Sequence, residues 1–293
     1  AALEHGNILK GNLSNTIFSN NEKLDNRDVC QFDHTKHTNV TNGKSNPCYG
    51  RQAVRFSNTE GSECDYRKIR DSDKKNNSVG ACAPFRRLHL CDRNLEEIYP
   101  DKITNTNNLL VDVLLAAKYE GQSITQDYPK YRATYGDSPS KMCTMLARSF
   151  ADIGDIIRGK DLYRRDSRTD KLEENLKVIF GNIYKELTAT SGKNVALRDR
   201  YQKDGPDYYQ LREDWWALNR DQVWKAITCN AWGDTYFHAT CSDSHRKESC
   251  CQANDYCRCD GDKPGVDKPN IDPPTYFDYV PQYLRWFEEW AED

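Results

Sequence analysis

Apolar side chains recur at helical spacing in several long stretches of this chain, whereas the alternation of apolar and polar residues that is typical of surface strands is absent. The first stretch follows residues 104–106, has its apolar positions within 109–117, and predicts a helix that ends at Gly121. The second stretch predicts a helix that begins with Ser138 as its N-cap and ends at Gly159.

Three further helices are predicted nearer the C-terminus. One begins at Asp170, where Glu173 three residues later completes a capping-box pattern. The next spans about residues 207–229, and its wide, tryptophan-rich apolar stripe predicts a central position in a bundle. The last begins near Pro281, after a loop region at 230–274. The predicted fold class is mainly α, a helical bundle with long loops.

The composition fits a folded protein with a modest core and a large polar surface. Hydrophobic residues make up 37% of the 293 positions, charged residues make up 30%, and the mean hydropathy is −0.92. The 17 Tyr, 9 Phe and 6 Trp residues are large apolar groups whose burial stabilises a fold, which argues against disorder. Residues 1–80 contain only short apolar pieces, which predict loops and at most one short helix.

Twelve cysteines indicate an oxidising, extracellular environment in which disulfides brace the long loops. Zinc binding is the alternative, but the chain has no C-x2-C pair, and its densest cysteine cluster lacks the spacing of a tetrahedral site. We therefore predict no metal and no cofactor. The residues predicted to form disulfides, in a pairing that the sequence does not reveal, are Cys30, Cys48, Cys64, Cys82, Cys91, Cys143, Cys229, Cys241, Cys250, Cys251, Cys257 and Cys259.

The ends of the chain and its hydropathy carry little targeting information. No apolar run follows a basic start, as it does in a secretory leader, and no run reaches the roughly 18 apolar residues of a membrane span. We therefore expect a mature or excised fragment that does not insert into a membrane. Sequons at Asn12, Asn39 and Asn76 mark exposed loops if the host glycosylates them.

Motifs for catalysis or nucleotide binding are incomplete or absent. Residues 154–160 fit G-x4-G-K, but Asp161 stands where a phosphate-binding loop needs Ser or Thr, and the segment ends a predicted helix. The adjacent carboxylates Glu96 and Glu97 would point in different directions on a helix, so they do not suggest an acid–base pair. Nothing in the sequence indicates an enzyme, although a catalytic triad assembled only in space would not be visible in it.

Lysine and arginine are concentrated in two zones, although the net charge is −3. Residues 51–93 contain ten Lys or Arg against six Asp or Glu, and residues 158–203 contain twelve against seven. The simpler interpretation is a solvated surface with interspersed acids. The functional one is that some clusters converge on an anionic polymer, and a sulfated glycan suits an extracellular chain better than nucleic acid. The candidate glycan-binding residues are Arg67, Lys68, Arg70, Lys74, Lys75, Arg86, Arg87, Arg158, Lys160, Arg164, Arg165 and Arg168.

Four blocks of sequence carry a more specific signal. They are residues 81–91 (ACAPFRRLHLC), 147–163 (ARSFADIGDIIRGKDLY), 211–229 (LREDWWALNR and VWKAITC) and 274–290 (PTYFDYVPQYLRWFEEW). Together they closely resemble a Duffy-binding-like domain of the alpha class, which belongs to the erythrocyte membrane protein 1 family of Plasmodium falciparum. Their large apolar residues are mostly positions assigned to the core above, so the blocks indicate the family and not the ligand site.

The resemblance implies a helical, disulfide-linked adhesion domain, which is extracellular and lies on the surface of the infected erythrocyte as part of a larger membrane-anchored protein. It implies no catalysis. The implied partners are host red-cell surface glycans or glycoproteins, including heparan sulfate or heparin and blood-group sugars, in the capture of uninfected red cells known as rosetting. We expect the chain to act as a monomer.

The resemblance also divides the chain. It implies an N-terminal segment at 1–45, a loop-rich first subdomain with one helix at 46–120, a helical-bundle second subdomain with a Cys-rich loop at 121–274, and the start of a truncated third subdomain at 275–293. Aromatic residues between 283 and 290 are then expected to be exposed. Two alternatives to glycan binding stay open: recognition of a blood-group sugar or glycoprotein by a shaped surface, and a scaffold fragment without binding of its own.

Overall fold

The structure is a computed structural model, and it describes residues 6–16, 28–40, 42–56, 61–70, 80–135, 141–165, 170–189, 195–232, 253, 255–268 and 271–292. The α-helices within these ranges are α1 (Gly6–Leu9), α2 (Phe85–Leu88), α3 (Arg93–Glu96), α4 (Thr106–Tyr135), α5 (Lys141–Arg158), α6 (Lys171–Ala189), α7 (Val195–Tyr201), α8 (Tyr209–Ile227) and α9 (Gln282–Glu292). The short 3-10 helices are η1 (Leu13–Asn15), η2 (Val29–Gln31), η3 (Pro100–Lys102) and η4 (Phe277–Tyr279).

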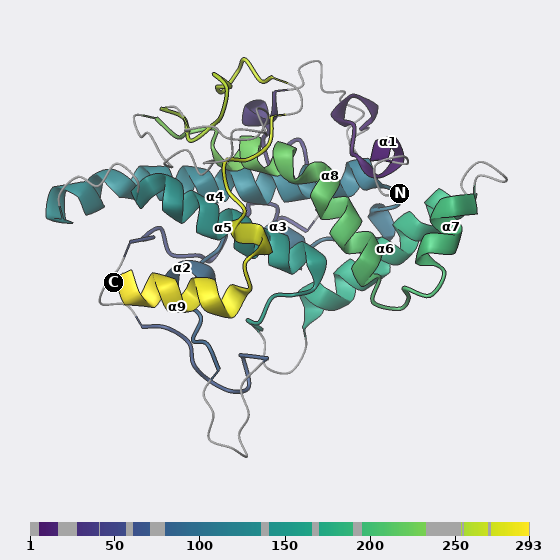
Figure 1. Cartoon of the computed structure of the whole chain (residues 1–293), viewed down its shortest axis with the longest axis horizontal. Helices are drawn as coiled ribbons and strands as arrows, with labels where there is room; N and C mark the ends of the chain where they lie inside the picture. Colours follow the sequence, from purple (N-terminus) through teal and green to yellow (C-terminus); the bar gives the residue numbers. More distant parts are fainter. Residues whose placement is uncertain are drawn as a thin grey trace, which may run out of the picture.

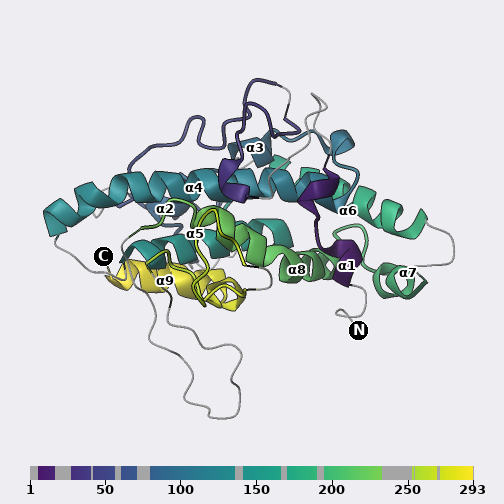
Figure 2. The ribbon, with the colours of Figure 1, turned by 90° about the horizontal axis from the view of Figure 1, so that it is seen from above.

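Three long helices build the centre of the molecule. α4, α5 and α8 pack against one another, with α6 and α7 towards one end and α9 towards the other (Figures 1 and 2). Trp215 and Trp216 of α8 are completely buried, and the ring of Trp216 lies 5.1 Å from that of Phe150 in α5. The described residues contain isolated β-bridges but no strand. The predicted mainly α fold class is confirmed, because the apolar stripes of these helices meet in one core.

The prediction that the first long helix ends at Gly121 is wrong, because α4 continues to Tyr135. Gly121 lies inside the helix and faces the C-terminal end of α8. A β-carbon at this position would meet the carbonyl oxygen of Ile227 and would lie 2.7 Å from its carbonyl carbon. Glycine is needed here because two helix backbones approach closely, and the sequence of one helix cannot show that.

The end predicted for α5 and the start predicted for α6 are both found, but the capping box predicted at the start of α6 does not form. α5 is followed by Gly159, whose φ of +73° lies in the left-handed region that favours glycine. Asp170 caps α6, since its side chain accepts a hydrogen bond from the backbone nitrogen of Glu173 at 3.3 Å. The side chain of Glu173 does not complete the capping box, because it pairs with Arg212 of α8 at 2.8 Å.

α8 and α9 agree with the sequence predictions, whereas α7 was not predicted. α8 lies inside the predicted range 207–229, and α9 begins directly after Pro281. α7 was not predicted, because its seven residues are too few to show a helical repeat. The predicted N-cap Ser138 lies outside the described residues.

The N-terminal part of the chain packs onto α4 and α8. Leu9 is buried in the main core, and its carbonyl oxygen accepts a hydrogen bond from the side-chain nitrogen of Asn219 at 3.0 Å. The side-chain oxygen of Asn219 in turn accepts one from the backbone nitrogen of Gly11 at 2.7 Å. The Cys30–Cys229 disulfide joins the same part of the chain to the residues just after α8. The division into an N-terminal segment and three subdomains stays a prediction.

Disulfides tie the loops to this frame, which confirms the prediction made from the cysteine count. The described bonds are Cys30–Cys229, Cys48–Cys91, Cys64–Cys82 and Cys143–Cys257. Cys259 is also disulfide-bonded, whereas Cys241, Cys250 and Cys251 lie outside the described residues. The first and last of these bonds span 199 and 114 residues, so they restrict the unfolded chain over long distances.

A buried carboxylate attaches the segment around residue 39 to α4. Asp112 is completely buried and accepts hydrogen bonds from the Thr38 hydroxyl and the Asn39 side-chain nitrogen, each at 2.9 Å. Burial raises the pKa of Asp112 from 3.8 to about 6. Asn39 is only 9% exposed, so its sequon does not mark an exposed side chain, whereas Asn12 is exposed and Asn76 lies outside the described residues.

Asp112→Asn is expected to flatten the pH dependence of stability between about pH 4 and pH 6. The pKa of the carboxyl group is higher in the folded than in the unfolded chain, so its contribution is fully present below its ordinary pKa of 3.8 and is lost as the pH rises through about 6. The loss amounts to roughly 2–3 kcal/mol. The amide can keep both contacts, because its oxygen accepts from Asn39 while its nitrogen donates to the Thr38 hydroxyl.

Urea unfolding at several pH values across this range measures the effect. The variant should be at least as stable as the wild-type protein at pH 7, and the difference between them should shrink towards pH 4. Burial also raises the pKa of Asp155 to about 6, so both proteins keep a residual slope. Equal slopes in the two proteins would contradict the prediction.

Candidate functional site

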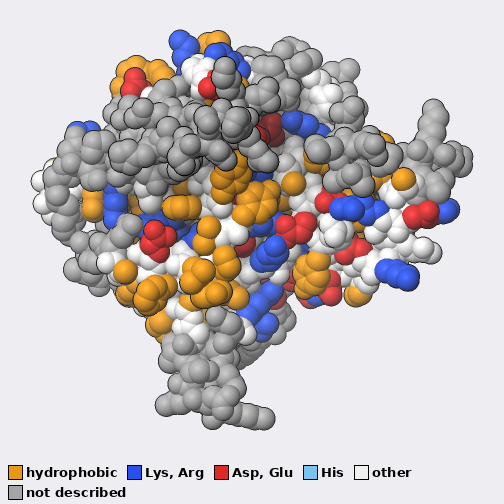
Figure 3. Space-filling model, viewed as in Figure 1, with side chains coloured by type: hydrophobic (Ala, Val, Ile, Leu, Met, Phe, Trp, Pro, Cys, Tyr) orange, Lys and Arg blue, Asp and Glu red, His pale blue; other side chains and the backbone are white. Residues whose placement is uncertain are grey.

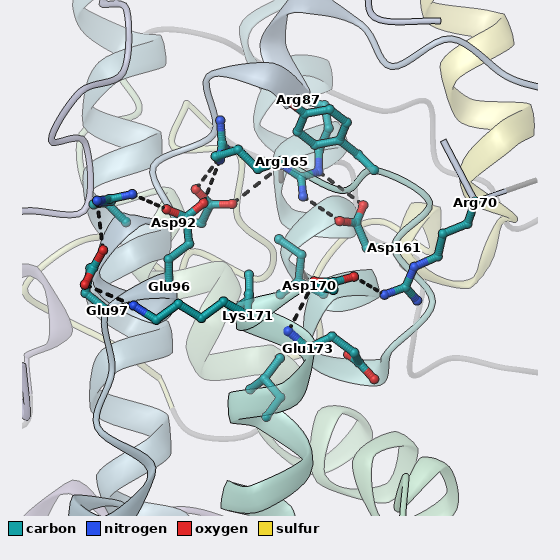
Figure 4. A pocket seen from close by; sticks show the side chains of 15 residues that line it. Arg70, Arg87, Asp92, Glu96, Glu97, Asp161, Arg165, Asp170, Lys171 and Glu173 are labelled. Carbon is teal, nitrogen blue, oxygen red and sulfur yellow. Dashed lines mark hydrogen bonds and ion pairs between the residues drawn. The ribbon is translucent and has the colours of Figure 1, made fainter. Parts of the chain in front are cut away.

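A small charged cavity lies between α3, the segment 161–165 and the start of α6. Its volume is about 240 Å³, and its walls carry paired arginine and carboxylate side chains together with a few apolar ones (Figure 4). The lining residues are Arg70, Arg87, Asp92, Arg93, Glu96, Glu97, Ile156, Asp161, Tyr163, Arg165, Asp170, Lys171, Leu172, Glu173 and Leu176.

Backbone pairing brings two of the predicted basic clusters together beside this cavity. Ile69 and Tyr163 form an antiparallel β-bridge, and the backbone nitrogen of Arg164 donates to the carbonyl oxygen of Lys68 at 2.7 Å. Trp286 of α9 is completely buried in an apolar cluster with Ile69 and Tyr163. α9 therefore supports the surface that carries these basic residues.

We name the exposed part of this surface the cationic edge and define it as Arg67, Lys68, Arg70 and Arg164. These four side chains are respectively 63%, 34%, 23% and 43% exposed. Their acidic partners are Asp65 for Arg67, Glu63 for Lys68, and Asp170 for both Arg70 and Arg164. Among the described residues, these four cations form direct ion pairs with three carboxylates.

Three of the candidate glycan-binding residues lie inside the protein, which corrects the surface position expected for them. Arg86 and Arg87 are 2% exposed and Arg158 is 1% exposed. Arg86 donates to both oxygens of Glu289 at 3.0 and 2.9 Å, and it also donates to Asp152 at 2.7 Å. The acids Glu289, Asp152 and Asp161, which pair with Arg86 and Arg87, come from other parts of the chain, so the local sequence did not show that these two arginines would be enclosed. Arg158 pairs with Asp155 of its own helix, and it also donates to the carbonyl oxygen of Asp278.

The remaining candidate glycan-binding residues lie at the surface, in the cavity wall or outside the described residues. Lys160 is 54% exposed and pairs with Glu213 of α8, but it does not line the charged cavity. Arg165 does line it, and its guanidinium contacts Glu96 at 2.6 Å and Asp92 at 3.2 Å. Lys74, Lys75 and Arg168 lie outside the described residues.

The walls of the cavity are ion-pair networks. Burial alone would raise the pKa of Asp92, but the guanidinium groups of Arg165, Arg51 and Arg87 hold it below its usual range. The opposite holds for Asp161, where burial outweighs the contact with Arg87 at 2.5 Å and raises the pKa. A ligand with acidic groups must therefore compete with carboxylates that are already in place.

Sequence reasoning missed the acidic half of this site. Glu96 and Glu97 were set aside because adjacent residues diverge on a helix, yet both line the cavity. The reason is that α3 is a single turn, and Glu97 lies just past its end. Asp170 was predicted only as a helix cap, but it also binds Arg70. A usable signal was the density of acids in residues 92–97 (DRNLEE) directly after Cys91.

Hydrophobic side chains gather over α9 on the face shown in Figure 3. Tyr283, Phe287 and Trp290 are exposed, and together with the Cys64–Cys82 disulfide they line a groove of about 820 Å³. The family resemblance led us to expect exposed aromatic residues here, but Trp286 of the same helix is completely buried. The groove gives the molecule a second surface that differs in character from the charged cavity.

The described residues lack two kinds of feature. They contain no group of three or more His, Cys, Asp or Glu side chains arranged to hold a metal ion. In addition, no helix within the described ranges is long and apolar enough to cross a membrane. The absence of catalysis and of cofactors, and the monomeric state, stay predictions.

The family model described as the Duffy binding domain matches residues 80–285. This match covers more than half of the sequence, and the chain therefore belongs to the Duffy binding domain family. The resemblance found in the four sequence blocks is confirmed. A search of curated proteins found no match.

Solved structures of PfEMP1 domains agree with this assignment. The NTS-DBL1α and CIDRγ double domain of PfEMP1 from the Plasmodium falciparum varO strain is 38% identical, with a TM-score of 0.79, over 98% of this chain and 40% of that chain. The NTS-DBL1α1 domain alone is also 38% identical, with a TM-score of 0.72, over 98% and 56%. A DBLβ domain of PfEMP1 bound to human ICAM-1 is 29% identical, with a TM-score of 0.69, over 99% and 57%. The chain thus spans about half the length of these structures.

Proposed function

We propose that this chain is part of an adhesion domain that is displayed on the infected erythrocyte and binds receptors on host red cells, as in rosetting. Membership of the Duffy binding domain family supports adhesion, and a DBLβ domain with the same fold was solved in complex with human ICAM-1. We further propose that the ligand of this chain is a sulfated glycan such as heparan sulfate, bound through the cationic edge.

The pairing of residues 68–70 with 162–164 is the observation that carries the glycan proposal. It assembles one exposed basic surface from two clusters that lie far apart in the sequence. A repeating anionic chain can follow such a surface and bind through many weak contacts. Because these contacts are exposed, added salt should screen them strongly.

Reversing the charge of the edge with Arg67→Glu, Lys68→Glu and Arg164→Glu together is expected to weaken heparin binding at least tenfold. Each change removes an attraction and adds a repulsion, and exposed ion pairs contribute roughly 0.2–1 kcal/mol each. About 1.4 kcal/mol in total corresponds to a tenfold change in affinity. Retention on a heparin column and equilibrium binding across a salt series measure the effect.

The matched control is Lys130→Glu, Lys185→Glu and Arg198→Glu, which changes the net charge equally at exposed positions away from the edge. This control should keep most of the heparin retention. An equal loss in both triple variants would contradict a localised site. The proposal also fails if the wild-type protein is retained by heparin no better than by a neutral column at low salt.

Recognition of a neutral blood-group sugar or a glycoprotein is the second candidate, and the groove lined by Tyr283, Phe287 and Trp290 favours it. Aromatic rings bind through apolar contact, which moderate salt leaves intact. Red-cell binding across a salt series separates the two candidates, since only the glycan proposal predicts a steep loss. A chain without any red-cell binding would favour the third alternative, a scaffold fragment.

A further inference from the structure

We propose that the Cys64–Cys82 disulfide is a site of thiol–disulfide exchange, where a dithiol reductant opens the bond and thereby loosens residues 61–67. This segment belongs to both candidate binding surfaces, since Ser62 and Cys64 line the aromatic groove and Arg67 belongs to the cationic edge. The exchange itself is independent of the proposed function. Its consequence for adhesion rests on that function.

The first observation is the accessibility of this bond. Cys64 is the one exposed cysteine among the four disulfides described above, and Cys82 is half-buried. Both cysteines line the groove of about 820 Å³ beside α9. Pockets for drug-sized ligands have roughly 300–1,000 Å³, so a small dithiol has room to reach the bond. Exposed disulfides are the ones that thiols reduce most readily.

The other three described disulfides are better protected. Cys91, Cys143 and Cys257 are completely buried, which shields two of these bonds from solvent. Cys30 and Cys229, which form the third bond, pack against the main core. A thiol in solution therefore meets the bond in the groove first.

The loss of this bond should leave the core folded. Its two cysteines are 18 positions apart in the sequence, compared with 43, 114 and 199 positions for the other described bonds. A disulfide restricts the unfolded chain less when the loop that it closes is short. Opening it therefore destabilises the whole fold less than opening any of the other three, and its effect stays local.

The disulfide lies next to a short β-bridge that joins the same two segments. The backbone nitrogens of Glu63 and Ala83 each donate to the carbonyl oxygen of the other residue, at 3.0 and 2.9 Å. Such hydrogen bonds contribute roughly 0.5–1.5 kcal/mol each, so the bridge should open far more often once the disulfide is broken. The exposed ion pair between Glu63 and Lys68 is screened by solvent and adds little. The pair of Arg67 with Asp65 lies within the segment and does not tie it to the rest of the protein.

The exchange is a two-electron reduction with the dithiol as the reductant. One thiolate of the dithiol attacks Sγ of Cys64, the exposed cysteine, and Cys82 leaves as a thiolate that takes up a proton. The second thiol of the reductant then attacks the reductant sulfur that is bound to Cys64, and Cys64 leaves and is protonated in turn. The dithiol ends as a disulfide, so two electrons and two protons have passed to the cysteine pair.

Mapping of free thiols on the wild-type protein tests the exchange site. The folded protein is treated with increasing concentrations of dithiothreitol, free thiols are alkylated, and the labelled peptides are identified by mass spectrometry. We expect Cys64 and Cys82 to be labelled at a dithiothreitol concentration at least tenfold lower than the other three described disulfides require. Equal or earlier labelling of any of those three would overturn the proposal.

Hydrogen exchange tests the loosening, in a variant that combines Cys64→Ser with Cys82→Ser. The amide hydrogens of Glu63 and Ala83 should exchange at least tenfold faster than in the wild-type protein, because the bridge then opens without the disulfide beside it. Unchanged exchange of these two amides would contradict the loosening.

The neighbouring pairing provides the internal control. The backbone nitrogens of Arg70 and Arg164 donate to the carbonyl oxygens of Leu162 and Lys68 at 2.9 and 2.7 Å. These two amides should keep their wild-type exchange rates in the variant, which also shows that it is folded. Faster exchange there as well would mean that the disulfide supports the whole fold, and this result too contradicts a local exchange site.

Red-cell binding connects the inference with the proposed function. The variant with Cys64→Ser and Cys82→Ser should bind red cells at least threefold more weakly than the wild-type protein, because Arg67 and the groove wall must then be ordered on binding. Equal binding by the two proteins contradicts the regulation of adhesion by this bond but not adhesion itself. A wild-type protein that binds no red cells contradicts the proposed function, while thiol mapping and hydrogen exchange still decide the exchange site.

Discussion

Gly121→Ala is expected to lower the free energy of unfolding by about 3 kcal/mol or more, one of the largest effects of a single methyl group in this chain. The added carbon would collide with the backbone carbonyl of Ile227 where α4 crosses the end of α8. A backbone group cannot rotate away as a side chain can, so the two helices must separate. Alanine's better helix propensity offsets only about 1 kcal/mol of this cost.

Urea unfolding followed by circular dichroism measures the change, with Gly61→Ala as the control. A β-carbon at Gly61 would meet nothing within 4 Å, and its φ is not positive, so the control should stay within about 0.5 kcal/mol of wild type. The same denaturation midpoint for the wild-type protein, Gly121→Ala and Gly61→Ala would show that the backbones of α4 and α8 do not approach each other this closely.

Arg86→Met is expected to destabilise the protein by about 3–5 kcal/mol, because it removes the arginine that pairs with the buried Glu289 and leaves Asp152 paired with Arg285 alone of its two arginines. The substitution keeps most of the side-chain volume but removes the contacts to Glu289, Asp152 and Ser149. Arg67→Met is the matched control, because Arg67 is 63% exposed and its pair with Asp65 is screened by solvent, so its loss should change stability little. Equal stability of the two variants would contradict the buried network.

Arg86→Met should also change how the free energy of unfolding depends on pH in the acid range. Burial alone would raise the pKa of Asp152, but Arg86 and Arg285 hold it below its ordinary value. A carboxylate whose pKa is lowered by folding stabilises the protein above its unfolded pKa, and this contribution is lost as the pH falls. Arg86→Met should therefore lose less stability than the wild-type protein between pH 5 and the acid limit of folding, which urea titrations at each pH will show.

Most long helices could be predicted from the sequence because their signals are local. Apolar spacing, the glycine after α5 and the aspartate before α6 each act within a few residues. Gly121 misled the prediction for the same reason: a glycine after an apolar stripe is typical of a helix end, and only the position of Ile227 shows why it lies inside one. α7 was too short to be recognised.

The site was harder to predict because it depends on pairs between distant residues. Counting charges along the chain grouped Arg86 and Arg87 with the exposed Arg67, since nothing local separates them. Their acidic partners Glu289, Asp152 and Asp161 come from α9, α5 and the segment after α5. The same folding that buries these arginines also pairs residues 68–70 with 162–164 and thereby creates the edge.

By itself, the sequence determined the helical class, the disulfide-bonded character and the family of this protein. These properties depend on residue spacing, cysteine content and core positions, all of which are visible along one dimension. Only the tertiary structure decided which cations are exposed, which carboxylates line the cavity and why Gly121 must be glycine. The physical reason is that burial and ion pairing depend on which distant residues meet, and the order of residues along the chain does not state that.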